Sequence, residues 1–533
     1  MTATISGAEL RALLDDRDRE VALLDVRAPA ARAAGHIAVS SGLPLHDLEH
    51  RIRQAVPRTG TTVVLASEPE LDEQAAHILT GLGYTDVAVV RDGLAGWTAA
   101  GGRLYTGTNV RSKTLGEWIE KHFGTATVDA DTVARWRAEG ADVVVLDSRP
   151  HSEYLHHHIP GGLDTGGGSE LAYRGLQGIT GPETTIVVNC AGRTRGIVGA
   201  QSLINTGIPN QVYSLHNGTP AWGWAGGRIE SGPGTPLDAP ADVPAHLIDW
   251  AATTLERLGV RVVDASSVGD GSRTTYSIDI RTPEEFAAGT VADARHVQGG
   301  QLVQASDEHL AVLDARVVLV DTPDLVRAAS TVQWLRYLHR GPIEVVVARP
   351  EILTSPRPES PTVPEVPEIS GKELADELES NSAPTVFDLR SSREYERGHL
   401  PGSIHARREH LRSAAQGRGR IVLVGDELND KTADVGTDLQ SGGGPVAYRP
   451  HFAARDLLDA GHDVRVVLGG PSSVPVEPTS DDPHYAGEIA DRVGPPPFGP
   501  ERDAWYRDYF DWEYALLGNS EGDRDFDFEA KSS

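Results

Sequence analysis

An internal repeat constrains this chain more than any other feature of its sequence. Each copy has an apolar strand that runs into Asp-x-Arg, then Gly-His or a variant of it, and then a second apolar strand. The first strands of the copies begin near Leu23, Val144, Ser277 and Val386. A repeat of this kind has to be interpreted first, because each copy is expected to be one structural unit. The sequence therefore predicts four related domains.

The repeat also predicts the fold class. The second strand of every copy is a short run rich in β-branched residues, at 61–67, 184–190, 316–321 and 420–425. Such runs, alternating with helical segments, are typical of parallel strands covered by helices on both faces. The prediction is α/β: four tandem domains, each a central parallel sheet flanked by helices, plus a helical C-terminal extension. The length of 533 residues agrees, since domains usually have about 100–150 residues.

Gly- and Pro-rich stretches mark the expected domain boundaries. The predicted domains are 1–107, 108–235, 236–355 and 366–475, followed by an aromatic helix and an acidic tail at 476–533. In that helix, Trp505, Tyr509 and Trp512 have the spacing i, i+4, i+7. This stripe is expected to pack on its own chain, with a subunit interface as the alternative. The acidic tail is expected to be disordered.

Charge and cysteine content exclude several classes of protein. A net charge of -28 and a pI near 5.1 oppose binding to nucleic acid or to an anionic membrane, because phosphate repels such a surface. The first residues lack an export signal, and no apolar run reaches about 18 residues, so a cytoplasmic location is expected. Because there is one cysteine, intrachain disulfides and cysteine-based structural metal sites are excluded.

That cysteine, Cys190, stands where an apolar strand ends and a helix is about to begin. A loop in this position can direct backbone N–H groups and the positive end of the helix dipole at the sulfur. Arg193 and Arg195 add positive charge nearby. In such surroundings the pKa of a cysteine falls from about 8.5 to roughly 3.5–7.5. A thiolate nucleophile at neutral pH is therefore predicted.

Asp-x-Arg, Glu-Tyr and His-Ile-Pro-Gly, together with the loop CAGRTR, resemble the rhodanese family over most of the chain up to about Val474. The resemblance implies a ping-pong sulfurtransferase that needs no cofactor. Cys190 would take sulfane sulfur from a small anion such as thiosulfate and pass it to cyanide or a thiol. The residues expected to bind the donor are those of the loop: Ala191, Gly192, Arg193, Thr194, Arg195 and Gly196.

Three alternative functions compete with sulfur transfer from thiosulfate. A related phosphatase and arsenate-reductase loop has five residues between Cys and Arg, whereas Cys190 and Arg195 enclose four, which favours sulfur transfer. Relatives that use 3-mercaptopyruvate have a loop resembling Cys-Gly-Ser-Gly, which differs from CAGRTR. A persulfide carrier or scaffold with little turnover stays open, as does binding of a protein partner or of a second copy of the chain.

The other copies have Ser67, Asp321 and Gly425 at the cysteine position, so domains one, three and four are predicted to be inactive. Because Asp-x-Arg also occurs in those copies, a structural role is predicted for the corresponding residues of domain two, Asp147, Arg149, Glu153 and His158. No metal site is expected in the run 156–158, since consecutive histidine side chains diverge.

Overall fold

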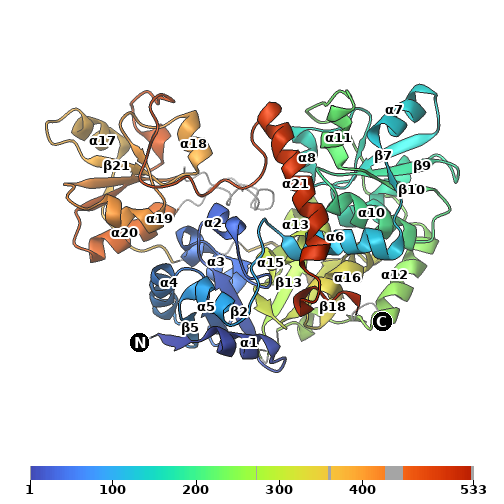
Figure 1. The fold of residues 1–533 in the computed structure, drawn as a ribbon, viewed down its shortest axis with the longest axis horizontal. Helices are drawn as coiled ribbons and strands as arrows, with labels where there is room; N and C mark the ends of the chain where they lie inside the picture. The colour runs from blue at the N-terminus through green and yellow to red at the C-terminus, as the bar shows by residue number, and fades with distance from the viewer. Residues whose placement is uncertain (1, 270, 272, 358–361, 427–447, 530–533) are drawn as a thin grey trace. The chain divides into compact units, whose positions relative to one another are not determined.

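The computed structural model describes residues 2–269, 271, 273–357, 362–426 and 448–529. The chain forms two compact units, one of residues 1–108 with 358–494 and one of residues 109–357 with 495–533. The first and fourth copies of the repeat thus share one unit, and the second and third share the other (Figure 1). In the described part of the chain, no helix is both long and apolar enough to cross a membrane.

The first unit contains two parallel sheets with their helices. The first copy comprises β1 (Ala3–Ile5), α1 (Gly7–Asp15), β2 (Val21–Asp25), α2 (Pro29–Ala34), β3 (Ser41–Gly42), α3 (Leu48–Ala55), β4 (Thr62–Leu65), α4 (Pro69–Gly81), β5 (Val87–Val90) and α5 (Gly93–Ala99). The fourth comprises β20 (Glu368–Ile369), α17 (Gly371–Leu378), β21 (Thr385–Asp388), α18 (Ser392–Arg397), β22 (Ile404–His405), α19 (Arg408–Ala414), β23 (Ile421–Val424), α20 (Arg449–Asp459), β24 (Val464–Val467) and β25 (His484–Tyr485).

The second unit is built in the same way. The second copy comprises α6 (Val110–Phe123), β6 (Thr127–Val128), α7 (Ala130–Ala138), β7 (Val143–Asp147), α8 (His151–His156), β8 (Leu163–Asp164), α9 (Leu171–Arg174), β9 (Thr185–Asn189), α10 (Thr194–Asn205), β10 (Val212–Leu215), α11 (Gly218–Trp224) and β11 (Thr235–Pro236). The third comprises α12 (Ala245–Arg257), β12 (Arg261–Val262), β13 (Thr275–Asp279), α13 (Pro283–Ala288), β14 (Thr290–Val291), β15 (Arg295–His296), α14 (Gly299–Gln304), α15 (Ser306–His309), β16 (Val312–Leu313), β17 (Arg316–Asp321), α16 (Val326–Leu338), β18 (Ile343–Val347) and β19 (Leu353–Thr354).

All four sheets share one strand order. It is β1-β5-β4-β2-β3 in the first copy, β6-β10-β9-β7-β8 in the second, β12-β18-β17-β13-β15 in the third and β20-β24-β23-β21-β22 in the fourth. The central pairs, such as β7 with β9 and β13 with β17, are parallel. Their apolar side chains are buried under helices, as predicted for runs of this composition. The predicted α/β fold class with repeated domains is therefore confirmed.

The Asp-x-Arg motif forms the same contact in every copy. The arginine Nη2 donates to the aspartate two positions earlier at 2.6–2.7 Å, in the pairs Asp25–Arg27, Asp147–Arg149, Asp279–Arg281 and Asp388–Arg390. The same nitrogen also donates to the backbone carbonyl eight residues further on. Since three of these copies lack cysteine, the pair serves to fix the turn after the strand.

The C-terminal extension begins with helix α21 (Pro500–Asn519), drawn in red in Figure 1, which packs on α6. Its buried side chains are Tyr506, Phe510, Glu513 and Leu516. The helix therefore docks on its own chain as predicted, but the expected stripe of Trp505, Tyr509 and Trp512 is only partly buried.

The expected disorder of the tail is wrong for the described residues after α21. A short 3-10 turn, Arg524–Phe526, follows the helix, and Phe528 is 1% exposed. The Phe528 ring lies 5.9 Å from the ring of Trp118 on α6. Burial of this aromatic side chain stabilises a segment whose acidic composition alone predicts no order.

Candidate active site

Cys190 lies directly after β9, and the loop that follows it leads into α10. The loop curls around the sulfur, so that the backbone N–H groups of Gly192 and Gly196 both donate to Sγ at 3.3 Å. The thiol is almost completely buried, with 2% of Cys190 exposed. The predicted wrapping of the sulfur by backbone amides is thus present in the structure.

Arg195 forms the principal ion pair of this loop. Its Nη1 and Nη2 donate to the two carboxylate oxygens of Glu153 at 2.6 and 2.9 Å. Burial opposes both charges, but the pairing outweighs it, so that the pKa of Arg195 is raised and that of Glu153 is lowered. The sequence predicted an ion-pair role for Glu153 without identifying its partner, which comes from a different element.

Arg193 is directed at carboxylates of α6. Its guanidinium donates to Glu117 at 2.8 and 2.9 Å and to Glu120 at 2.5 Å. The same side chain donates to the hydroxyl of Tyr514 at 3.0 Å and lies over that ring. The two positive charges expected beside the sulfur are therefore present, but each arginine is paired with carboxylates.

The expected low pKa of Cys190 is also wrong. Burial raises the pKa of the thiol above its usual value, and the nearby Glu513 adds to the rise. Arg195 and the two backbone amides oppose this shift without cancelling it. The positive charges around the loop can be read from the sequence, but the effect of Glu513, on a helix more than 300 residues away, cannot.

That helix, α21, contributes residues the sequence argument missed. The rings of Tyr509 and Phe510 pack on Gly192, each 3.6 Å from the position a Cβ would take there. Thr194 Oγ1 donates to Glu513 Oε1 at 2.5 Å. Lys113 Nζ lies 5.0 Å from the centroid of the Tyr509 ring. In the sequence, the aromatic stripe of Trp505, Tyr509 and Trp512 is the one sign of this contact face of α21, and the stripe is centred slightly to one side of the face.

The residues predicted to be structural lie below the loop. Asp147 accepts from Arg149 and also from Asn189 Nδ2 at 3.0 Å, which ties β7 to the strand that ends at Cys190. His158 is 2% exposed, its Nδ1 lies 3.0 Å from the carbonyl of Tyr154, and its ring stacks on that tyrosine. Neither side chain is aimed at the sulfur by any of these contacts.

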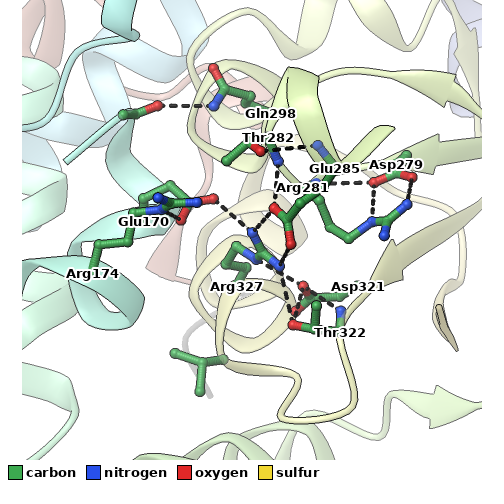
Figure 2. Close-up of polar contacts among 12 residues, drawn as sticks. Glu170, Arg174, Asp279, Arg281, Thr282, Glu285, Gln298, Asp321, Thr322 and Arg327 are labelled. Atoms are coloured by element: carbon green, nitrogen blue, oxygen red, sulfur yellow. Dashed lines mark hydrogen bonds and ion pairs between the residues drawn. The ribbon is translucent and has the colours of Figure 1, made fainter. Parts of the chain in front are cut away.

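The third copy shows what occupies the same place when cysteine is absent. Asp321 corresponds to Cys190, because Val320 before it pairs with Asp279 as Asn189 pairs with Asp147. The Asp321 carboxylate accepts from the backbone N–H groups of Thr322 and Ala328, both at 2.8 Å. Arg327 Nε also donates to Asp321, at 3.0 Å. Figure 2 shows the Arg327 guanidinium between Asp321, Glu285 and Glu170.

The other two substitutes for cysteine are also occupied by protein contacts. Ser67 donates its backbone N–H at 2.8 Å and its hydroxyl to the carboxylate of Asp72. A side chain on Gly425 would meet Pro450 at 2.3 Å, so cysteine could not be placed there without movement. Neither position offers a nucleophile.

Space beside the loop that follows β9 is limited. A cavity of about 30 Å³ is lined on one side by Thr194 and Arg195 and on the other by residues of the third copy, including Gly299 and Trp334. Such a volume has room for at least one water molecule. Among the residues that the structure describes, no group of three or more His, Cys, Asp or Glu side chains could hold a metal ion.

The rhodanese-like domain family matches residues 6–100, 129–224 and 370–473, more than half of the chain. The chain therefore belongs to the rhodanese-like domain family. The matched segments leave out the third copy, whose sheet nevertheless has the common strand order.

Among solved structures, a thiosulfate sulfurtransferase from Pseudomonas aeruginosa is 33% identical, with a TM-score of 0.87, over 98% of this chain and 99% of that chain. The Alr3790 protein from Anabaena sp. is 26% identical over 19% of this chain and 80% of its own, with a TM-score of 0.18. BH2092 from Bacillus halodurans is 20% identical over 21% and 85%, with a TM-score of 0.19. Comparison with curated protein sequences gave no match.

Proposed function

We propose that this protein is a sulfurtransferase that carries sulfane sulfur as a persulfide on Cys190. The observation that carries the proposal is the pair of backbone amides, from Gly192 and Gly196, that donate to the sulfur of the one cysteine in the chain. Amides fixed in this way stabilise negative charge on the sulfur of the thiolate. The full-length likeness to a thiosulfate sulfurtransferase supports the same chemistry.

The reaction has two balanced steps. The Cys190 thiolate attacks the outer sulfur of thiosulfate, the S–S bond breaks, and sulfite leaves with the bonding pair. The persulfide then gives its outer sulfur to cyanide or to a thiolate, which forms thiocyanate or a new persulfide and restores the Cys190 thiolate. Nucleophilic catalysis of this kind requires no cofactor.

Arg195 is the proposed contact for the anionic donor. In the third copy, Arg327 holds Glu285 with its Nη atoms while its Nε donates to the carboxylate of Asp321. Arg195 holds Glu153 with the same two Nη atoms. An arginine in this position can therefore keep its glutamate and still face an anion at the cysteine position.

The direct test is steady-state turnover with thiosulfate and cyanide. We expect Cys190→Ser to abolish turnover, because a hydroxyl is a far weaker nucleophile toward sulfur. The Ser67→Ala variant should turn over at the wild-type rate, because Ser67 lies in the first domain, whereas Cys190 lies in the second, and its backbone N–H donates to Asp72. Residual activity of Cys190→Ser above a few percent would contradict a single catalytic site.

A persulfide carrier is the second candidate, and the burial of Cys190 favours it. In that case the three domains without cysteine would recruit partner proteins in the cytoplasm, and Cys190 would relay sulfur with little turnover of its own. The same assay separates the two candidates. Whether it is loaded from thiosulfate or from 3-mercaptopyruvate, a stable persulfide that turns over slowly with cyanide and small thiols, and quickly only with a protein thiol, supports the carrier.

A further inference from the structure

Helix α21 covers the catalytic loop residue by residue. Tyr509 and Phe510 pack on Gly192, Tyr514 contacts Arg193, and Glu513 accepts from Thr194. Three consecutive loop residues are thus in contact with one helix from the other end of the sequence. A loop that binds a small anion from solution cannot do so while its outer side is covered in this way.

The covering face also carries the wrong charge for an anionic donor. Glu513 is completely buried, and its Oε1 accepts from Thr194. The Tyr509 hydroxyl lies within hydrogen-bonding reach of the same carboxylate, and the buried Lys113 ammonium interacts with its charge. A carboxylate at this place repels thiosulfate, and a low local dielectric strengthens that repulsion.

We propose that α21 is the gate of the Cys190 site and that Glu513 is its charge filter. In the closed position the helix excludes bulky reagents, and small anions are excluded more strongly than small neutral molecules. Lifting α21 uncovers the loop and removes the carboxylate at the same time. The proposed function enters here only through the anion that would reach Cys190 in the cell, a sulfane donor such as thiosulfate. The gate itself does not depend on the proposed function.

The remaining contacts of the helix suit a device that opens. Tyr514 sits over the outer edge of the loop, where its hydroxyl donates to Asn217 at 2.9 Å and lies 2.8 Å from His216 Nε2, in an exposed setting. Trp224 Nε1 donates to Asp503 at 3.0 Å, also in an exposed setting. Water can replace these exposed hydrogen bonds at small net loss. Lifting the helix must in addition break the buried bond from Thr194 to Glu513 and the contact of Arg193 with Tyr514.

The test compares two alkylating reagents of similar size, neutral iodoacetamide and anionic iodoacetate, on Cys190 of the full-length protein. The variants are Glu513→Gln, which removes the charge; Phe510→Ala, which removes a ring that packs on the loop; and Asp511→Asn, which removes an exposed carboxylate of the same helix. The ratio of the two rates corrects for any change in the pKa of the thiol, because both reagents react with the same thiolate.

We expect Glu513→Gln to raise the iodoacetate-to-iodoacetamide ratio by roughly tenfold, Asp511→Asn to leave it unchanged, and Phe510→Ala to raise both rates. An unchanged ratio in Glu513→Gln overturns the charge filter. Wild-type rates equal to those of an exposed thiol at the same pH overturn the gate. If Phe510→Ala does not fold, Tyr514→Phe, which removes the outer hydrogen bonds, takes its place.

These outcomes are independent of sulfur transfer. A protein that never forms a persulfide can still show gated, charge-selective alkylation, which would leave the gate standing and remove the proposed function. A protein that loads sulfur from thiosulfate at rates insensitive to Glu513→Gln and Phe510→Ala, with alkylation equally insensitive, would keep the function and lose the gate.

Discussion

The loops after β9 and β17 use the same design for opposite purposes. After β9, the amides of Gly192 and Gly196 donate to the sulfur of Cys190. After β17, two backbone amides donate to the carboxylate of Asp321. The second loop carries its own carboxylate, whose pKa burial raises to about 6, whereas the first keeps a nucleophile in the equivalent place. In both copies the loop after the strand supplies backbone amides. The residue that these amides surround is a cysteine in the second copy and an aspartate in the third.

The arginines of the two loops extend the comparison. Arg195 and Arg327 each pair with a glutamate four residues after the Asp-x-Arg arginine, Glu153 and Glu285 respectively. Arg327 also reaches Glu170 of the second copy, at 3.1 Å, and its side chain is completely buried (Figure 2). In the third copy the loop has therefore become a clamp between two domains.

The largest effect is expected from breaking that clamp. Arg327→Met should lower the free energy of unfolding of the second unit by about 3–5 kcal/mol, because Asp321 is left as a buried carboxylate without its ion-pair partner and Glu170 keeps only Arg174. Urea denaturation would measure it, with Arg257→Met, an exposed arginine of α12, as the control. A change no larger than that of the control would show that the network is not a clamp.

A smaller effect is expected from removing the loop arginine of the second copy. Arg195→Met should raise the pKa of Cys190 further, because Arg195 is the charge that favours the thiolate. Alkylation by iodoacetamide followed against pH would measure the midpoint, and the Michaelis constant for thiosulfate should rise as well.

Arg193→Met is the matched variant, since it also takes one arginine from the loop and leaves carboxylates unpaired. Its midpoint should move less than that of Arg195→Met. Equal shifts of the Cys190 pKa in both variants would contradict the prediction that Arg195 favours the thiolate more than Arg193 does.

The wild-type midpoint is itself a prediction. Because burial raises the pKa of Cys190, alkylation should have its midpoint above about 8.5, the value of a free thiol. The thiolate is then lost as the pH falls through that midpoint, so reaction at neutral pH should be slow. A midpoint near or below 7 would restore the activated thiolate that the sequence alone suggests.

The smallest effect is expected in the first copy. Ser67→Ala removes a hydroxyl that donates to Asp72, and should lower the free energy of unfolding by about 0.5–1.5 kcal/mol. Thermal unfolding would detect this. A large loss would show that the loop of the first copy is as important to its unit as Arg327 is to the second.

The local features of the fold and of the candidate site could be predicted from the sequence. Strand ends, the Asp-x-Arg turns and the position of Cys190 follow from short-range patterns of apolar residues, because a strand and the loop after it are neighbours in the chain. The amides around Cys190 follow for the same reason. The family resemblance then assigned the chemistry to that loop.

The non-local part could not be read from the sequence. Glu153 and Arg195 come from different elements, and Glu513 reaches Thr194 across more than 300 residues. No periodicity encodes such pairs, since they depend on how separate helices dock. The pairing of the first copy with the fourth is hidden for the same reason, as is the burial of Phe528 within an acidic tail.

Cys190 is the one cysteine of the chain and the one expected site of sulfur loading, and the intact mass of the protein after incubation with excess thiosulfate tests this claim most directly. With small molecules removed, we expect a gain of one sulfur atom per chain, located at Cys190 by peptide mapping and reversed by mild reductant. An unchanged mass, in a protein whose Cys190 can still be alkylated, would contradict the claim.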